Sequence, residues 1–244
     1  MSSRKELEDY FKSYKIKVGS NTNDKEMQWL VNNINKARCS DKPDAYLIDA
    51  NIAYGIEHFK VSMNKEDRKG AEEIKIEACV KNRDKLKQDE RVELTPSLDR
   101  LQISLISNLK QHSDSFSSYE ENVLQLTGCQ KYRLVVFIEC YSKSSYIVKN
   151  QGIQPIDPLE LDIIVNPLLD YTDLIWGVIF ATGNEQEKIL YAYTINELLL
   201  KKQEGKLLNA SEYKAFEDRH DYYVSKDEPQ NDSHIVHINL FDHI

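Results

Sequence analysis

Residues 43–61 read PDAYLIDANIAYGIEHFKV. Two short apolar runs, residues 45–48 and 52–56, lie on either side of the polar turn Asp49-Ala50-Asn51. Runs of this length that are rich in β-branched and aromatic residues and are separated by a turn are typical of a β-hairpin. The second strand is predicted to continue through Phe59 and Val61. This stretch therefore places a sheet at the centre of the predicted fold.

The chain before the hairpin is predicted to be helical. An amphipathic helix is expected at residues 7–14, where apolar side chains recur at helical spacing. A second helix is predicted from its N-cap Asp24 to near Ser40, before the turn-like residues that precede the hairpin. The apolar face of this second helix is formed by Met27, Leu30, Val31 and Ile34.

The chain after the hairpin first becomes charged and helical, and strands then return. Asn64 to about Leu126 is the predicted helical segment, with an amphipathic helix beginning at Leu98. Further strands are predicted at residues 134–138, 174–181, 189–194 and 234–240, and a short helix at 196–202. This order predicts a mixed α/β (α+β) fold with a central mixed β-sheet flanked by helices. We expect a single domain over residues 1–244 with a helical insertion at about 64–127.

Composition narrows the class of protein. The 244 residues are 41% hydrophobic, and no window approaches about 18 uninterrupted apolar residues. The first residues carry charges without an apolar core, unlike a secretory signal. The four cysteines form no closely spaced pair, which disfavours a disulfide framework or a zinc knuckle. We therefore expect a soluble cytoplasmic protein with no membrane partner.

The net charge of −8 is unevenly distributed along the chain. Residues 151–244 contain 7 Lys/Arg and 17 Asp/Glu, so most of the excess negative charge lies there. An acidic total gives no support to bulk electrostatic binding of nucleic acid, but it allows a local basic groove within the first 150 residues. One basic cluster falls in the predicted insertion and consists of Lys81, Arg83, Lys85 and Lys87.

The hairpin carries two acidic residues in positions that suit a metal ion. Asp44 lies where the first strand begins, and Glu57 interrupts the largely apolar second strand. Adjacent strands lie about 4.8 Å apart, so two such carboxylates can reach one divalent ion. Mg²⁺ prefers a few carboxylate oxygens together with retained waters, which leaves room for a phosphate oxygen and an attacking water.

This arrangement resembles the PD-(D/E)xK nuclease superfamily, which includes many restriction and repair nucleases. In that superfamily a strand Asp and a following strand Glu bind Mg²⁺, and Asp44 and Glu57 match them. The resemblance spans roughly residues 22–62 and 130–200. It implies a restriction-endonuclease-like core, Mg²⁺ (or Mn²⁺) as cofactor, and hydrolysis of phosphodiester bonds in DNA or RNA.

The lysine of the superfamily motif is displaced in this chain. It should stand two residues after the Glu, where Phe59 is found, and Lys60 follows one residue late. Because strand side chains alternate between faces, Lys60 should point away from Glu57 unless a bulge intervenes. The resemblance also allows Lys110, on a following helix, to supply the lysine. It further suggests Glu26, on the helix before the first strand, as a third metal ligand.

Other interpretations of the same residues remain open. Asp44 suits an ordinary turn, and Glu57 suits a buried ion pair as well as a metal site. Lys110 and His112 are placed to line a substrate groove or only to face solvent. At the chain's end, His234 and His237 should point to opposite sides of a strand, which disfavours a metal site there. The alternatives to a nuclease are a catalytically inactive nuclease-fold binding or regulatory protein, or a protein–protein interaction module. DNA versus RNA and the oligomeric state stay open.

Overall fold

The computed structural model describes residues 6–19, 22–63, 90–92, 97–140, 145–152, 154–183, 187–217 and 222–224. The strands are β1 (Lys15–Val18), β2 (Arg38–Cys39), β3 (Ala45–Asp49), β4 (Ile52–Val61), β5 (Glu90–Val92), β6 (Lys131–Cys140), β7 (Ser145–Lys149), β8 (Gly177–Gly183), β9 (Glu187–Thr194), β10 (Tyr213–Glu217) and β11 (Tyr222–Val224). The α-helices are α1 (Glu6–Ser13), α2 (Lys25–Asn33), α4 (Leu98–Thr127), α5 (Asp162–Leu169) and α6 (Ile195–Gln203). Short 3₁₀ turns cover Ile34–Lys36, Pro158–Glu160 and Ala210–Glu212.

The main sheet is mixed, and its strands run in the order β1-β9-β8-β6-β4-β3-β2. Strands β4, β6 and β8 are parallel to one another, whereas β3 and β9 are antiparallel to their neighbours β4 and β8. Strand β7 pairs with β8 and with β10, and β5 pairs with β11 in a separate ribbon. The predicted fold class, a mixed sheet flanked by helices, is confirmed.

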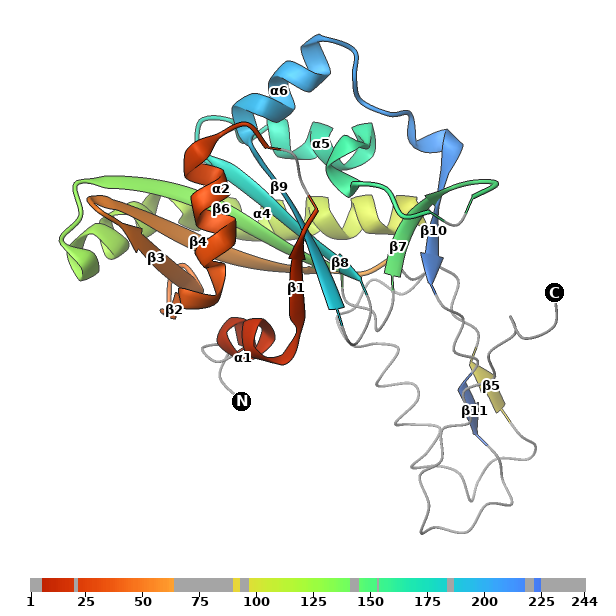
Figure 1. Cartoon of the computed structure of the whole chain (residues 1–244), viewed down its shortest axis with the longest axis horizontal. Helices are drawn as coiled ribbons and strands as arrows, with labels where there is room; N and C mark the ends of the chain where they lie inside the picture. The colour runs from red at the N-terminus through yellow and green to blue at the C-terminus, as the bar shows by residue number, and fades with distance from the viewer. Residues whose placement is uncertain are drawn as a thin grey trace.

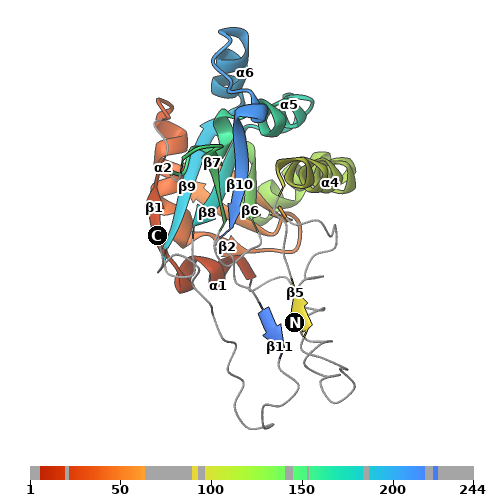
Figure 2. The same ribbon diagram turned by 90° about the vertical axis from the view of Figure 1, so that its right-hand side faces the viewer.

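Helices cover both faces of the sheet (Figures 1 and 2). Helices α1 and α2 bury Phe11, Met27 and Leu30 against one face, in an apolar cluster that includes Phe137 of β6. Helices α4, α5 and α6 pack on the other face in a second cluster. In Figure 2, α2 and α4 lie on opposite sides of the sheet. Alternate side chains of β4 therefore face different helices, α1 and α2 on one face of the sheet and α4 on the other.

The predicted hairpin is formed by β3 and β4, with Ala45 opposite Ile56 and Asp49 opposite Ile52. Strand β4 also pairs with β6 without interruption from Ile52 to Val61. Because the ladder has no bulge, side chains alternate regularly along β4. Glu57 and Phe59 face the helix α4 side, and His58 and Lys60 face the helix α1 side.

The predicted helices form, with different ends. Asp24 caps α2, and its Oδ1 accepts a hydrogen bond from the Met27 N–H at 2.9 Å. This helix ends at Asn33 and not near Ser40, because a 3₁₀ turn and the two-residue strand β2 intervene before the hairpin. The helix that begins at Leu98 continues to Thr127, where Gly128 ends it with a left-handed φ of 71°.

Several sequence-based predictions fall outside the described residues. These are most of the proposed insertion, including its basic cluster, and the C-terminal strand with its histidines. Within the part of the chain that is described, no helix combines the length and the apolar character needed to cross a membrane.

Candidate functional site

Asp44 and Glu57 lie opposite each other on neighbouring chain segments of one sheet. Asp44 directly precedes β3, and extending the hairpin register by one residue places it across from Glu57. The Asp44 carboxylate is held in place because its Oδ2 accepts a hydrogen bond from the backbone N–H of His58 at 2.9 Å. In the turn that leads to Asp44, the Ser40 hydroxyl donates a hydrogen bond to the Pro43 carbonyl at 2.6 Å and so closes the turn.

The two carboxylates share a poorly solvated environment. Glu57 is only 3% exposed, and Asp44 is half-buried. Burial raises the pKa of Asp44, and the neighbouring Glu57 raises it further, while the His58 N–H and the two nearby imidazoles oppose the shift. A half-buried carboxylate whose ionised form is disfavoured by a neighbouring carboxylate belongs to a negative site that a cation would stabilise.

Helix α4 adds a histidine to this pair. The Nδ1–H of His112 donates to the Oε1 of Glu57 at 2.6 Å. The His112 side chain is 26% exposed, whereas that of Glu57 is 4% exposed, so the imidazole connects a buried carboxylate with the surface. The imidazole also lies against the Phe59 ring, with centroids 5.2 Å apart. Phe59 occupies the sequence position where the motif of the resemblance has its lysine. The imidazole of His112, which can accept or donate a proton, therefore lies beside that position.

Two tyrosine hydroxyls complete the surroundings of Glu57. Tyr119 of α4 is hydrogen-bonded to the Glu57 carboxylate, and its pKa is raised by burial and by that carboxylate. Tyr132 of β6 lies beside Pro43 and Gly55, and a Cβ at Gly55 would collide with its hydroxyl. The Tyr132 hydroxyl is buried without a hydrogen-bond partner among the described residues. Burial, followed by the charge of Glu57, raises its pKa as well.

Lys60 is not brought to the carboxylates by the structure. The uninterrupted β4 ladder puts its side chain on the opposite face of the strand from Glu57, together with His58. On that face the His58 Nε2 and the Glu139 Oε2 are 2.8 Å apart, and both side chains are buried. Tyr10 of α1 covers this second pair, with its ring centroid 6.5 Å from that of His58.

Glu26 also lies away from Asp44 and Glu57. It belongs to α2, which packs on the other face of the sheet, and its Oε2 is 3.8 Å from the Nε of Arg133. Its negative charge contributes to the raised pKa of the buried Tyr54, which places it towards the first half of β4. The third ligand suggested by the resemblance is therefore not assembled with the other two.

Lys110 lies on a different side of α4 from His112. Two residues correspond to about 200° around a helix, so the two side chains point in nearly opposite directions. Lys110 is exposed and lines a pocket between α4 and α5 that also includes Asn166 and Lys202. Of the two substrate-binding residues predicted from sequence, only His112 joins the carboxylates.

The residues present suit a divalent ion that takes oxygen ligands and needs only one or two of them from the protein. Among the described residues, no group of three or more histidine, cysteine or acidic side chains is arranged to hold a metal. Mg²⁺ differs from most metals in this respect, because one or two carboxylates together with waters and substrate phosphates are enough to hold it. Asp44 and Glu57, whose carboxylate is also bonded to His112 and Tyr119, provide such a pair, and the repulsion of Glu57 on Asp44 favours a cation.

Sequence reasoning identified the two acids but not their partners. The contacts of Glu57 with His112 and Tyr119 join β4 to a helix that follows much later in the chain. No local period or spacing encodes such contacts. The one available signal was a carboxylate inside an apolar strand, which requires a partner when buried.

Comparisons with family models, with curated proteins and with solved structures find no match. Function must therefore be argued from the chemistry of the site itself.

Proposed function

We propose that this protein is a nuclease-like hydrolase of nucleic-acid phosphodiester bonds that uses Mg²⁺ or Mn²⁺. The observation that carries the proposal is the convergence of three groups: the opposed carboxylates of Asp44 and Glu57, and the imidazole of His112 bonded to Glu57. The placement of the two acids on successive hairpin strands agrees with the resemblance to the PD-(D/E)xK superfamily.

The metal has a defined contribution in this scheme. Asp44 and Glu57 would hold it, and it would supply positive charge that stabilises the developing negative charge on the phosphate. Asp44 is oriented for this role by the His58 N–H, which fixes one of its oxygens. Buried, pre-oriented ligands need little rearrangement, which favours tight positioning of the substrate phosphate.

His112 is suited to the proton transfers of hydrolysis. Because Nδ1–H donates to Glu57, the other ring nitrogen, Nε2, is the one available to accept a proton. In hydrolysis, water adds to phosphorus and the P–O ester bond breaks. Nε2 takes the proton of the water, and the leaving oxygen takes a proton from solvent. The buried Glu57 keeps the ring in the required tautomer and stabilises the imidazolium that forms.

A second candidate function is a binding or regulatory protein that keeps this fold without catalysis. Phe59 favours it, because a fully buried phenyl ring stands where the motif lysine is expected. In this alternative Glu57 and His112 form a structural ion pair between β4 and α4. The two candidates differ in whether the site binds a divalent cation and cleaves a substrate.

Cleavage and metal binding can be tested on the full chain. We suggest incubating end-labelled single- and double-stranded DNA and RNA with the protein in Mg²⁺, in Mn²⁺ and in EDTA, and titrating both metals by calorimetry. Asp44→Asn is the test variant. Asp49→Asn, at the far end of the same strand β3, is the matched control.

The proposal expects cleavage that requires metal, is lost in Asp44→Asn and persists in Asp49→Asn. Metal binding without cleavage of any substrate would support the non-catalytic alternative. Absence of both metal binding and cleavage would overturn the proposal.

A further inference from the structure

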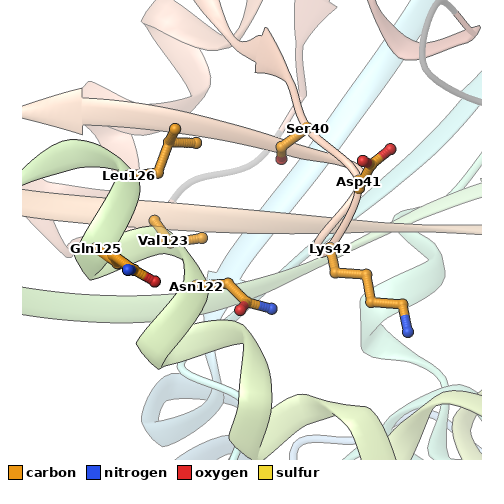
Figure 3. Close-up of a pocket in the computed structure, with 7 residues that line it drawn as sticks. All are labelled: Ser40, Asp41, Lys42, Asn122, Val123, Gln125 and Leu126. Atoms are coloured by element: carbon orange, nitrogen blue, oxygen red, sulfur yellow. The ribbon is translucent and has the colours of Figure 1, made fainter.

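A groove lies beside the candidate site and has a volume of about 830 Å³ (Figure 3). One wall is the turn of Ser40, Asp41 and Lys42, which leads to the hairpin. The other wall is the last part of α4, where Asn122, Gln125 and Leu126 face the turn. This volume is within the range of small-ligand pockets and is ample for one nucleobase.

Both walls continue directly into the candidate site. Asp44 follows Lys42 by two residues, and the turn is closed by the Ser40 N–H, which donates to the Asp44 carbonyl at 3.0 Å. On α4, Tyr119 is one helical turn before Val123, which also lines the groove. A molecule in the groove would therefore touch the turn that leads to Asp44 and the helix that carries His112, the partner of Glu57.

The lining of the groove suits a base better than a phosphate. Lys42 and Asp41 carry opposite charges, and the acidic Glu120 and Glu121 are adjacent on α4, so the groove has no excess positive charge. Asn122 and Gln125 are exposed, and each amide presents one donor and one acceptor side by side. Such amides form paired hydrogen bonds with base edges, as Asn and Gln do with adenine.

An apolar surface is also available for the face of a base. Leu126 is 59% exposed and lines the groove next to the two amides. Val123 also lines the groove but is only 1% exposed, so the apolar contact comes from Leu126. Polar amides beside an exposed apolar side chain match the chemistry of an unpaired nucleobase, whose faces are apolar and whose rim is polar.

We propose that this groove binds one unpaired base of the nucleic-acid strand whose phosphodiester lies at Asp44 and Glu57. The inference rests on the proposed function, since it takes the substrate to be a nucleic acid. It makes Asn122 and Gln125 specificity-determining residues, and it predicts a preference for bases with adjacent donor and acceptor groups, with adenine first.

The test measures binding in EDTA, so that it does not depend on cleavage. Labelled single-stranded homopolymers of each DNA base are titrated with the full chain, and binding is followed by fluorescence polarisation. The Asn122→Ala/Gln125→Ala double variant is compared with wild type. The matched control is Asn32→Ala, an exposed amide on α2 at the other face of the sheet. Because all three residues are exposed, we expect each variant to keep the melting temperature of wild type.

Wild type should prefer the adenine homopolymer. The double variant should lose roughly tenfold or more of that affinity, with little change for the weakest-binding base. Asn32→Ala should bind as wild type does. As a second variant, Leu126→Asp should weaken all four homopolymers, because it removes the apolar contact and repels phosphate.

The outcomes separate the inference from the proposed function. Base-selective binding that is lost in the double variant, without hydrolysis in Mg²⁺ or Mn²⁺, would keep the groove assignment and reject the nuclease. Hydrolysis by wild type with homopolymer binding unchanged in both groove variants would reject the groove assignment alone. Failure of wild type to bind any homopolymer would overturn the inference.

Discussion

Two neighbouring substitutions that each remove one negative charge should change stability to different extents. Asp44→Asn keeps the shape of the side chain, and its amide oxygen can still accept the His58 N–H. Glu57→Gln also keeps its shape but weakens the bond from His112, which is charge-assisted in wild type. In EDTA at neutral pH we expect the first variant to be as stable as wild type or more stable. The second should be the less stable of the two variants.

The difference between the two variants can be estimated without knowing the size of the repulsion. Each substitution abolishes the same Asp44–Glu57 repulsion, so that contribution cancels. Asp44→Asn makes one charge-assisted hydrogen bond neutral, that from the His58 N–H, whereas Glu57→Gln does so for two, those from His112 and Tyr119. A hydrogen bond to a charged group contributes about 1.5–3 kcal/mol, and a neutral one about 0.5–1.5 kcal/mol. Because of the one additional bond at Glu57, the free energy of unfolding should differ by about 1 kcal/mol between the two variants. For a chain of this size this corresponds to roughly 2–4 °C in Tm.

The pH dependence has a definite sign. The folded-state pKa of Asp44 lies above its ordinary value of 3.8. Its contribution to stability is therefore full below that value and is lost as the pH rises through the folded pKa. The advantage of Asp44→Asn over wild type should be largest at neutral pH and should disappear in acid.

Thermal melts followed by circular dichroism, in EDTA and in saturating Mg²⁺, measure all of these effects. Wild type should gain about 2.7 kcal/mol at a Mg²⁺ concentration of 100 times Kd, and both variants should lose most of that gain. The reasoning would be refuted if Asp44→Asn were the less stable variant in EDTA, or if both variants kept the full response to Mg²⁺.

Three further predictions concern other residues. His112→Ala should slow hydrolysis by about 10²–10⁴-fold and keep the Mg²⁺-induced rise in Tm; an unchanged rate in a single-turnover assay would exclude it as the base. Burial raises the pKa of Asp157 to about 6, so wild type should lose on the order of 2–3 kcal/mol of stability as the pH rises from about 4 to 6. Urea midpoints of Asp157→Asn should fall less than those of wild type across that window, and a slope equal to that of wild type would contradict the assignment. Gly55→Ala should cost about 1–3 kcal/mol in urea unfolding, because its Cβ would overlap the Tyr132 hydroxyl and Pro43. Adding Tyr132→Phe should recover part of this loss, and no recovery would assign the strain to Pro43 and to the ring carbon of Tyr132 that phenylalanine keeps.

The fold could be predicted where the signals are local. The hairpin, the Asp24 cap and the buried strand β6 each follow from neighbouring residues, and each forms as predicted. Strands β1, β7 and β10 were not predicted. Strand β1 is mostly exposed and depends on parallel pairing with β9, about 170 residues later, with Lys17 bonded to Glu187 at 2.6 Å. A short polar strand that is stabilised by a distant partner has no period of its own to detect.

The sequence predicted the two acidic residues of the candidate site but not the contact of His112 with Glu57. The acids were visible because one follows a proline turn and the other interrupts an apolar strand. The expectation that Lys60 faces away from Glu57 without a bulge follows from strand alternation, and the ladder has no bulge. That His112, and not Lys110, reaches Glu57 depends on how α4 is rotated against the sheet. This rotation is set by the packing of residues such as Leu105 and Leu109, and not by the residues of the site.

Strand β4 sends a carboxylate–histidine pair to each of its faces, and the surroundings distinguish their roles. The His58–Glu139 pair has side chains that are 6% and 13% exposed and is enclosed by the rings of Tyr10 and Phe137. The hydrogen bond between His58 and Glu139 is enough to explain why these two polar side chains lie in an apolar environment. The Glu57–His112 pair has a second carboxylate across from it, an imidazole that reaches the surface, and a groove at its side. Two neighbouring carboxylates together with solvent access favour binding of a ligand, and this combination, more than the presence of a Glu–His pair, is why we propose the functional site on the helix α4 side of the sheet.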